Sequence, residues 1–295
     1  MDKTIFYIVD VFAQEKFSGN QLAVFRSGKN LSDEQMQKIA KEMNFSETTF
    51  ILSEEIKEKE YNVRIFTPER ELPFAGHPTL GTAFVIQHEI LKKPVKEITL
   101  NLKAGKIPVS FIYTSDNKCT LWMKQLQPTF GDNYDAKSIS EILDLNIDDI
   151  NNTFPIQEVS TGLQVIIVPI KTLDAIKRAK INKDKYFDFI KNTKAKTILI
   201  FCPETYHFTH DLNVRFFADE YGIPEDPATG SANGCLAAYL VKYRFFGKKR
   251  INLQVEQGYE IGRFALLFLK AKERKKEINV YVGGKVEFIA KGEFV

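Results

Sequence analysis

Residues 77–83 read His-Pro-Thr-Leu-Gly-Thr-Ala, and residues 226–232 read Asp-Pro-Ala-Thr-Gly-Ser-Ala. A second matching pair precedes them, Asn-Val-Arg-Ile-Phe at 62–66 and Asn-Val-Arg-Phe-Phe at 213–217. Ten residues separate the two blocks in the first copy and eight in the second. Chance is the alternative explanation, because Pro and Gly are common in loops. Two blocks in the same order at nearly constant separation favour an internal repeat.

Both copies of the repeat lead from a strand through a loop into an apolar helix. We expect these helices over about residues 79–91 and 229–243. Because each is apolar on much of its surface, each is expected to lie inside a wrapping sheet. Short segments rich in Val, Ile, Phe and Tyr dominate the rest of the chain and are typical of β-strands. We expect an N-terminal lobe of residues 1–127, completed by a terminal strand at 284–295, and a C-terminal lobe of residues 128–283.

The composition excludes several classes of partner. The net charge is +3, from 41 basic and 38 acidic residues, so the chain lacks the large positive field of a dedicated nucleic-acid-binding protein. No apolar run approaches the roughly 20 residues that span a bilayer, and the N-terminal sequence does not resemble a signal peptide. We therefore expect a cytoplasmic protein that binds neither nucleic acid nor membrane.

The spacing of cysteines and histidines gives no support for a metal site. Cys119, Cys202 and Cys235 are odd in number and far apart, which favours neither a zinc knuckle nor a disulfide framework. His207 and His210 form an HxxH pair, but no third ligand or helical pattern accompanies them. The chain also lacks the Gly-x-Gly-x-x-Gly, Walker and Gly-x-Ser-x-Gly motifs. We therefore expect no metal and no cofactor.

The repeated turns have a chemical consequence. Pro78 and Pro227 fall at or just before the first helical turn, where a missing N–H is harmless. The small residues that follow, among them Gly230 and Ser231, leave backbone amides uncovered near a helix N-terminus. Such an end carries unsatisfied N–H groups and about half a positive charge, so it favours a carboxylate or other anion. Two copies related by a pseudo-twofold axis would direct both ends into one cleft, a pocket for a small anionic substrate.

Three side chains are candidates for proton transfer. His77 and Asp226 occupy corresponding places in the two repeats, at the mouth of the expected cleft, although helix capping is the alternative for each. Glu47 lies between apolar and hydroxyl residues, where a helix gives way to a strand. Burial there would suit a carboxyl that carries a proton near neutral pH, whereas composition alone favours an exposed loop glutamate. Asn20 is a candidate substrate contact, or else a turn residue.

Four segments together resemble the PhzF-like (phenazine biosynthesis-like) proteins, which share the diaminopimelate-epimerase fold. They are FSGN at 17–20, FSETTF at 45–50, PFAGHPTLG at 73–81 and EDPATGSA at 225–232. The resemblance runs over essentially the whole chain, and the last two motifs are highly specific. It implies an α+β fold of two pseudo-twofold-related lobes, with the site between them. Each lobe would be a curved, mostly antiparallel sheet or barrel around a central buried helix.

The same resemblance implies roles for individual residues. The family's general acid/base carboxylate matches Glu47, and its assisting histidine and aspartate match His77 and Asp226. Its substrate-holding backbone turns match three small residues, Gly76, Gly230 and Ser231. The phenazine enzyme of the family isomerises a dihydro-hydroxyanthranilate by moving a proton along a conjugated ring. It needs no cofactor or metal and works as a dimer, so we expect a homodimer here.

Two departures from the family pattern bear on the chemistry. The parent epimerases use two cysteines, one on each turn, whereas residues 75–77 and 227–230 contain none and Cys235 lies inside its expected helix. Two-thiol racemisation is therefore disfavoured. In addition, Gln21-Leu22 follows Gly-Asn where many relatives carry Pro-Ala, which alters the expected pocket wall.

The leading hypothesis is a cofactor-independent isomerase that acts on a small carboxylate-bearing metabolite in the interlobe cleft. Glu47 would take a proton from an activated carbon and return it elsewhere, while His77 and Asp226 form hydrogen bonds and balance charge. Closure of the lobes would exclude water. Two other classes stay open. One is a ligand-binding or regulatory protein that kept the cleft without catalysis, and the other is a hydrolase or lyase acting on a related small acid.

Overall fold

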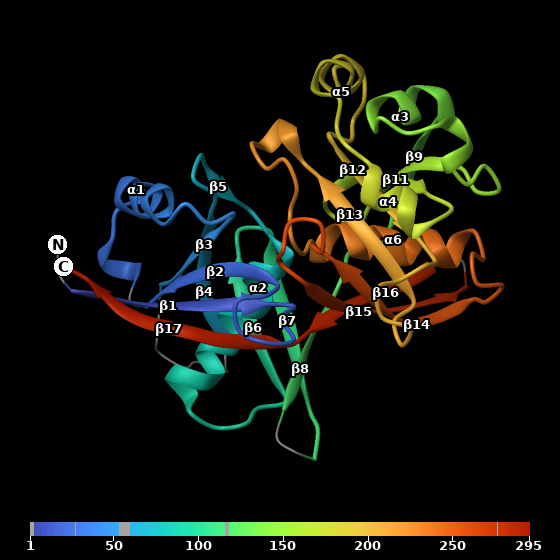
Figure 1. Cartoon of the computed structure of the whole chain (residues 1–295). Helices are drawn as coiled ribbons and strands as arrows, with labels where there is room; N and C mark the ends of the chain where they lie inside the picture. The colour runs from blue at the N-terminus through green and yellow to red at the C-terminus, as the bar shows by residue number, and fades with distance from the viewer. Residues whose placement is uncertain (1–2, 27, 53–59, 116–117, 276) are drawn as a thin grey trace. The chain divides into compact units, whose positions relative to one another are not determined.

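The chain forms two compact units. Unit 1 comprises Met1–Lys124 and Gly283–Val295, and unit 2 comprises Gln125–Val282. The structure is a computed structural model, and it describes residues 3–26, 28–52, 60–115, 118–275 and 277–295. Figure 1 shows the strands and helices of both units.

Unit 1 is a mostly antiparallel sheet. Its strands are β1 (Thr4–Val11), β2 (Asn20–Phe25), β3 (Thr48–Ile51), β4 (Glu60–Phe66), β5 (Glu71–Leu72), β6 (Glu97–Leu102), β7 (Gly105–Tyr113), β8 (Cys119–Lys124) and β17 (Val286–Phe294). They pair in the order β17-β1-β2-β3-β4-β6-β7-β8, and β5 also pairs with β4. Within the described part of the unit, the parallel steps are β2–β3 and β4–β6.

Unit 2 repeats this topology. Its strands are β9 (Thr129–Tyr134), β10 (Ile156–Ser160), β11 (Gln164–Pro169), β12 (Thr197–Cys202), β13 (Leu212–Phe217), β14 (Arg250–Gln257), β15 (Ala265–Arg274) and β16 (Glu277–Gly284). They pair in the order β9-β10-β11-β12-β13-β14-β15, with β16 beside β15. The parallel steps, β11–β12 and β13–β14, occupy the same places as those of unit 1. The predicted internal repeat is confirmed.

Helices supply the crossovers that parallel steps require. The α-helices described are α1 (Asp33–Met43), α2 (Gly76–Val85), α3 (Ala136–Ile142), α4 (Leu173–Arg178), α5 (Lys183–Ile190) and α6 (Gly230–Lys242), of which α3 lies between the antiparallel strands β9 and β10. α1 connects β2 to β3, whereas α4 and α5 connect β11 to β12. α2 and α6 occupy the second crossover of each unit. Of the helices described, none combines the length and the apolar character that a membrane span requires.

α2 and α6 are the buried centres of their units. α2 is buried except at Phe84, and α6 is buried from Ala232 to Val241. α2 contacts β1, β2, β3, β6, β7 and β8, and α6 contacts β10, β11, β14 and β15. Because strands lie on several sides of each helix, apolar residues are needed around most of its circumference. Gly81 permits close packing, since a Cβ there would lie 2.6 Å from Leu22 Cδ2.

The ends of the central helices only partly match the expectation. α6 begins one residue after its expected start and ends one residue before its expected end. α2 begins at Gly76, three residues early, and Pro78 is tolerated at its third position because an N–H in the first turn has no intrahelical partner. Beyond Val85 the chain continues as a π-helical turn, Ile86–Leu91.

The repeat extends to side-chain contacts. Arg64 on β4 donates through Nε and Nη2 to the two carboxylate oxygens of Glu71, at 2.8 and 2.9 Å. Arg215 on β13 makes the same bidentate pair with Glu225, at 2.9 and 2.7 Å. Each guanidinium also lies 5.0 Å from the ring of the phenylalanine two residues further on. Bidentate pairs fix geometry, so in both units this arginine holds the segment that leads to the central helix.

Truncation of a buried side chain on α2, the central helix of unit 1, should destabilise the fold. Leu80 is fully buried, so Leu80→Ala should lower the free energy of unfolding by about 2–5 kcal/mol, through lost apolar burial and the cavity left behind. Ile112→Ala on β7 is the control, because that side chain is 51% exposed. Urea denaturation measures both changes. Equal losses in the two variants would contradict the central position of α2.

Candidate active site

Glu47 lies at the junction of α1 and β3 in unit 1. Asn44 takes a left-handed φ of 53° that ends α1. The chain enters β3, which is buried at all four positions, directly after Glu47. The side chain of Glu47 is only 13% exposed. The exposed-loop alternative for this carboxylate is therefore wrong.

His77 lies between Glu47 and Asn20. Its Nε2 is 3.4 Å from Glu47 Oε2, and its Nδ1 is 3.3 Å from the side-chain nitrogen of Asn20. Asn20 is the first residue of β2 and is buried. A contact of 2.8 Å between the hydroxyl groups of Thr49 and Thr82 joins β3 to α2. Three residues that were predicted separately, from three segments of the sequence, thus form one cluster in unit 1.

Burial determines the charge of His77. The ring is almost inaccessible to water, and this loss of hydration lowers the pKa of His77 to about 3. The imidazole is therefore neutral at pH 7 and offers one N–H donor and one acceptor nitrogen. In this state His77 can form hydrogen bonds with its neighbours.

A buried carboxylate that the sequence analysis did not single out, Asp10, holds the loop before Asn20. Asp10 on β1 accepts a hydrogen bond from the Phe17 N–H at 2.8 Å. Gly19 in the same loop takes a φ of 65°, and a Cβ there would lie 2.3 Å from the Val11 carbonyl oxygen. Only glycine fits that position. The sequence feature that could have indicated this role is an aspartate inside an apolar strand, because a buried charge needs hydrogen-bond partners.

The N-cap residues of the two central helices do not cap them with their own side chains. Gly76 is the first residue of α2, and its N-cap Ala75 makes no side-chain cap hydrogen bond. Gly230 and Ser231 open α6, whose N-cap Thr229 also makes no such bond. Neither His77 nor Asp226 occupies the N-cap position of its helix, because those positions are Ala75 and Thr229.

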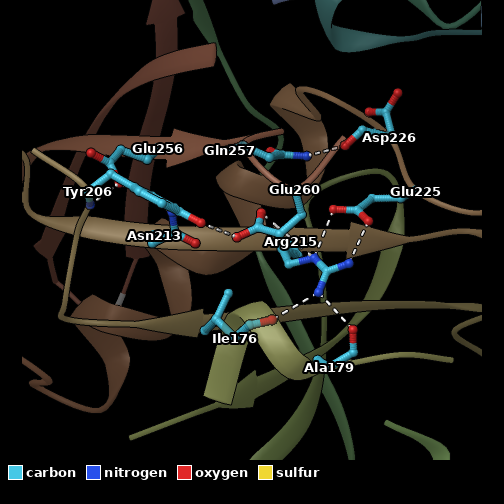
Figure 2. Close-up of polar contacts among 10 residues, drawn as sticks. All are labelled: Ile176, Ala179, Tyr206, Asn213, Arg215, Glu225, Asp226, Glu256, Gln257 and Glu260. Atoms are coloured by element: carbon cyan, nitrogen blue, oxygen red, sulfur yellow. Dashed lines mark hydrogen bonds and ion pairs between the residues drawn. The ribbon is translucent and has the colours of Figure 1, made fainter. Parts of the chain in front are cut away.

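Asp226 lies at the second turn, in unit 2. It is buried, and its backbone N–H donates to the Phe216 carbonyl at 3.0 Å, which ties the turn to β13. Its Oδ2 accepts a hydrogen bond from the hydroxyl of Thr229. Figure 2 shows Gln257 beside it, a buried residue that no sequence pattern indicated.

The HxxH pair has a structural role. His210 Nδ1 lies 2.7 Å from Oε1 of the fully buried Glu256. The same carboxylate accepts hydrogen bonds from the backbone N–H groups of Tyr206 and His207, both at 2.8 Å. Glu256 therefore anchors the loop before β13. In the part of the chain that the structure describes, no group of three His, Cys, Asp or Glu residues could hold a metal ion.

Comparison with known proteins identifies relatives along nearly the whole chain. The profile of the "Phenazine biosynthesis-like protein" family matches residues 9–292. An uncharacterised isomerase of Clostridium acetobutylicum is 33% identical, over 98% of this chain and 97% of its own. The trans-2,3-dihydro-3-hydroxyanthranilate isomerase of Pseudomonas aeruginosa is 31% identical, over 97% and 98%. A PhzF-family phenazine biosynthesis protein of Bacillus anthracis has a crystal structure that matches with a TM-score of 0.90, at 28% identity and 100% coverage of both chains.

These matches agree with the topology of both units. Mostly antiparallel strands around a central helix, present twice, give the α+β fold that PhzF-like proteins share with diaminopimelate epimerase. Both relatives compared by sequence are named isomerases. The chain therefore belongs to the phenazine biosynthesis-like (PhzF-like) protein family, and it is an enzyme of the isomerase class.

Proposed function

We propose that the protein is a cofactor-independent isomerase that moves a proton between two carbons of a small carboxylate-bearing metabolite. The observation that carries the proposal is the cluster of Glu47, His77 and Asn20. A largely buried carboxylate beside a neutral imidazole is an arrangement suited to proton transfer.

Glu47 is the general acid/base in this proposal. Its carboxylate takes a proton from an activated carbon, and the electron pair of that C–H bond enters the conjugated system of the substrate. Glu47 then delivers a proton to a second carbon, so that no atom is gained or lost, and in D₂O the proton that it delivers can have exchanged with solvent. Asn20 contacts the His77 ring, and His77 Nε2 lies 3.4 Å from Glu47 Oε2. In this proposal His77 orients the Glu47 carboxylate for both steps.

The starts of α2 and α6 support the binding of an anion. Backbone N–H groups at the beginning of a helix attract a carboxylate, and the N-cap residue of neither helix covers them with its own side chain. In the proposed complex, Gly76, Gly230 and Ser231 present amides to the substrate carboxylate. Asp226 forms a hydrogen bond with a polar group of the substrate. The homodimer expected from the family is part of the same proposal.

Two-thiol racemisation is not part of the proposal. Neither turn contains a cysteine. Burial within α6 raises the pKa of Cys235 to about 11, so its thiol does not serve as a base at neutral pH. Its sulfur lies 3.4 Å from the Leu163 carbonyl oxygen, as expected of a packed structural residue.

Replacement of Glu47 by Gln should remove turnover and leave the fold intact. The amide matches the shape of the carboxylate but cannot accept the proton, so kcat should fall by about 10²–10⁴-fold. The assay uses trans-2,3-dihydro-3-hydroxyanthranilate, the substrate in the name of the Pseudomonas relative, together with a pool of small unsaturated acids in D₂O. Liquid chromatography separates the isomerised product from the substrate, and mass spectrometry measures deuterium bound to carbon.

Glu69→Gln is the matched control, because Glu69 is an exposed glutamate of the same unit. It should retain wild-type turnover. Near-normal activity of Glu47→Gln would contradict the proposed role. Binding of an acid by the wild type without product or deuterium would indicate a binding protein, and a product of different mass would indicate a hydrolase or lyase.

The buried His77 should make stability depend on pH. Its pKa falls from 6.5 in the unfolded chain to about 3 in the folded protein, so between these values only the unfolded state binds the proton. The free energy of unfolding should therefore decrease as the pH falls below about 6.5. In His77→Gln this contribution is absent, so stability should change less between about pH 7.5 and 5. Urea denaturation at both pH values measures the difference.

His88→Gln is the control for this measurement, because His88 belongs to the same unit and its side chain is 49% exposed. This variant should keep the wild-type dependence. A wild-type pH dependence in His77→Gln would show that His77 is not held neutral by burial.

A further inference from the structure

Gln257 closes the turn that carries Asp226. It is the last residue of β14 and is fully buried. Its Nε2 donates to the Asp226 carbonyl oxygen at 2.8 Å, and its Oε1 accepts from the Thr229 N–H at 3.2 Å. Figure 2 shows the first of these bonds. One side-chain amide therefore bonds both ends of the turn, and a buried amide whose two groups are bonded holds its partners firmly.

The same amide determines the direction in which the Thr229 hydroxyl donates its hydrogen bond. Gln257 Nε2 also lies 3.2 Å from Thr229 Oγ1, and that hydroxyl donates to Asp226 Oδ2. A hydroxyl has a single hydrogen and two acceptor lone pairs. Because the amide N–H occupies a lone pair of Oγ1, the hydroxyl hydrogen points to the carboxylate. Gln257 thus sets the direction of a hydrogen bond that Asp226 accepts.

Asn233 fixes which way the Gln257 amide faces. Asn233 lies one turn into α6, and its Nδ2 donates to Gln257 Oε1 at 2.8 Å and to the Thr229 carbonyl at 3.1 Å. Because Asn233 Nδ2 is a hydrogen-bond donor, the atom of Gln257 that faces it must be the acceptor oxygen Oε1. The NH₂ group of Gln257 must then face Asp226 and Thr229.

The residue before Asp226 is held from another side. Glu225 accepts the bidentate pair from Arg215 described above. Arg215 Nη1 in turn donates to the carbonyls of Ile176 and Ala179, at 2.9 and 2.8 Å, as Figure 2 shows. The Asp226 backbone is therefore restrained on one side by the Gln257 amide and on the other by the Arg215–Glu225 pair.

The side-chain amide of Gln257 has no counterpart at the corresponding position of the other repeat. The parallel pairings of β4 with β6 and of β13 with β14 place Asn101 and Glu256 in corresponding positions. The next residue is Leu102 in unit 1 and Gln257 in unit 2. Both are buried, but leucine has no side-chain donor or acceptor. Position 257 therefore differs in the copy that carries the aspartate.

We propose that Gln257 is a positioning residue for Asp226, acting through the Thr229 hydroxyl. This proposal rests on the role in catalysis proposed above for Asp226. The first test needs no substrate: it follows the side-chain carboxyl ¹³C resonance of Asp226 at pH 7. That resonance should shift in Gln257→Leu, which installs the residue of the other repeat, and in Thr229→Val.

Thr229→Ser keeps the hydroxyl and should restore the wild-type position of the resonance. Gln254→Leu, an exposed glutamine on the same strand, should not move it. The Thr229→Val and Thr229→Ser pair keeps the proposal open to contradiction even if Gln257→Leu does not fold. An Asp226 resonance that stays in place in Thr229→Val would overturn the proposal.

The second test uses the acid that the wild type isomerises in D₂O, with trans-2,3-dihydro-3-hydroxyanthranilate as the first probe. Gln257→Leu should lower kcat about 10- to 100-fold, because a misplaced group loses its alignment with the substrate. KM should change less than about 3-fold. In an Asp226→Asn background the same substitution should have no further effect on kcat, whereas additive losses would overturn the proposal. If the wild type isomerises no acid, the proposed function fails, and the carboxyl resonance still decides whether Gln257 positions Asp226.

Discussion

Both units depend on one constraint, the parallel steps in an otherwise antiparallel sheet. A parallel step cannot be closed by a tight turn, so the chain must cross over, and the second crossover of each unit is a buried helix. The first N–H groups of that helix have no partner within it. Each crossover thus brings polar backbone into an apolar interior, and there the chain places His77 in one copy and Asp226 in the other.

Much of this could be predicted from short segments of sequence. The two Asn-Val-Arg strands and the two Pro-containing turns revealed the repeat, because each copy must preserve the strand, the loop and the start of the helix. α6 was predicted to within a residue at each end, since its apolar stripe is long and uninterrupted. Glu47, His77 and Asn20 were each singled out by local pattern and family motif, and the fold places them together.

What the sequence could not show depends on contacts between distant residues. Gln257 lies 31 residues beyond Asp226 and looks like an ordinary strand residue, and its partners follow from strand register and the position of α6. Asp10 similarly acquires its role through a loop that returns to β1. The neutrality of His77 depends on how completely strands enclose α2, which no local pattern gives. Local chemistry identified the candidate residues, whereas tertiary packing determines which other residues support them.

The position of β17 has a consequence for the order of folding during synthesis. β1 pairs along its length with β17, so Thr4 meets Phe294 and Val11 meets Val286. Unit 2 is contiguous and emerges from the ribosome complete, while β1 still lacks one neighbour. The nascent N-terminal half must keep an open strand edge until β17 has been synthesised, and such edges invite pairing with other chains. The usual vectorial order is therefore reversed: the later-synthesised unit can fold first, and the earlier one is finished last.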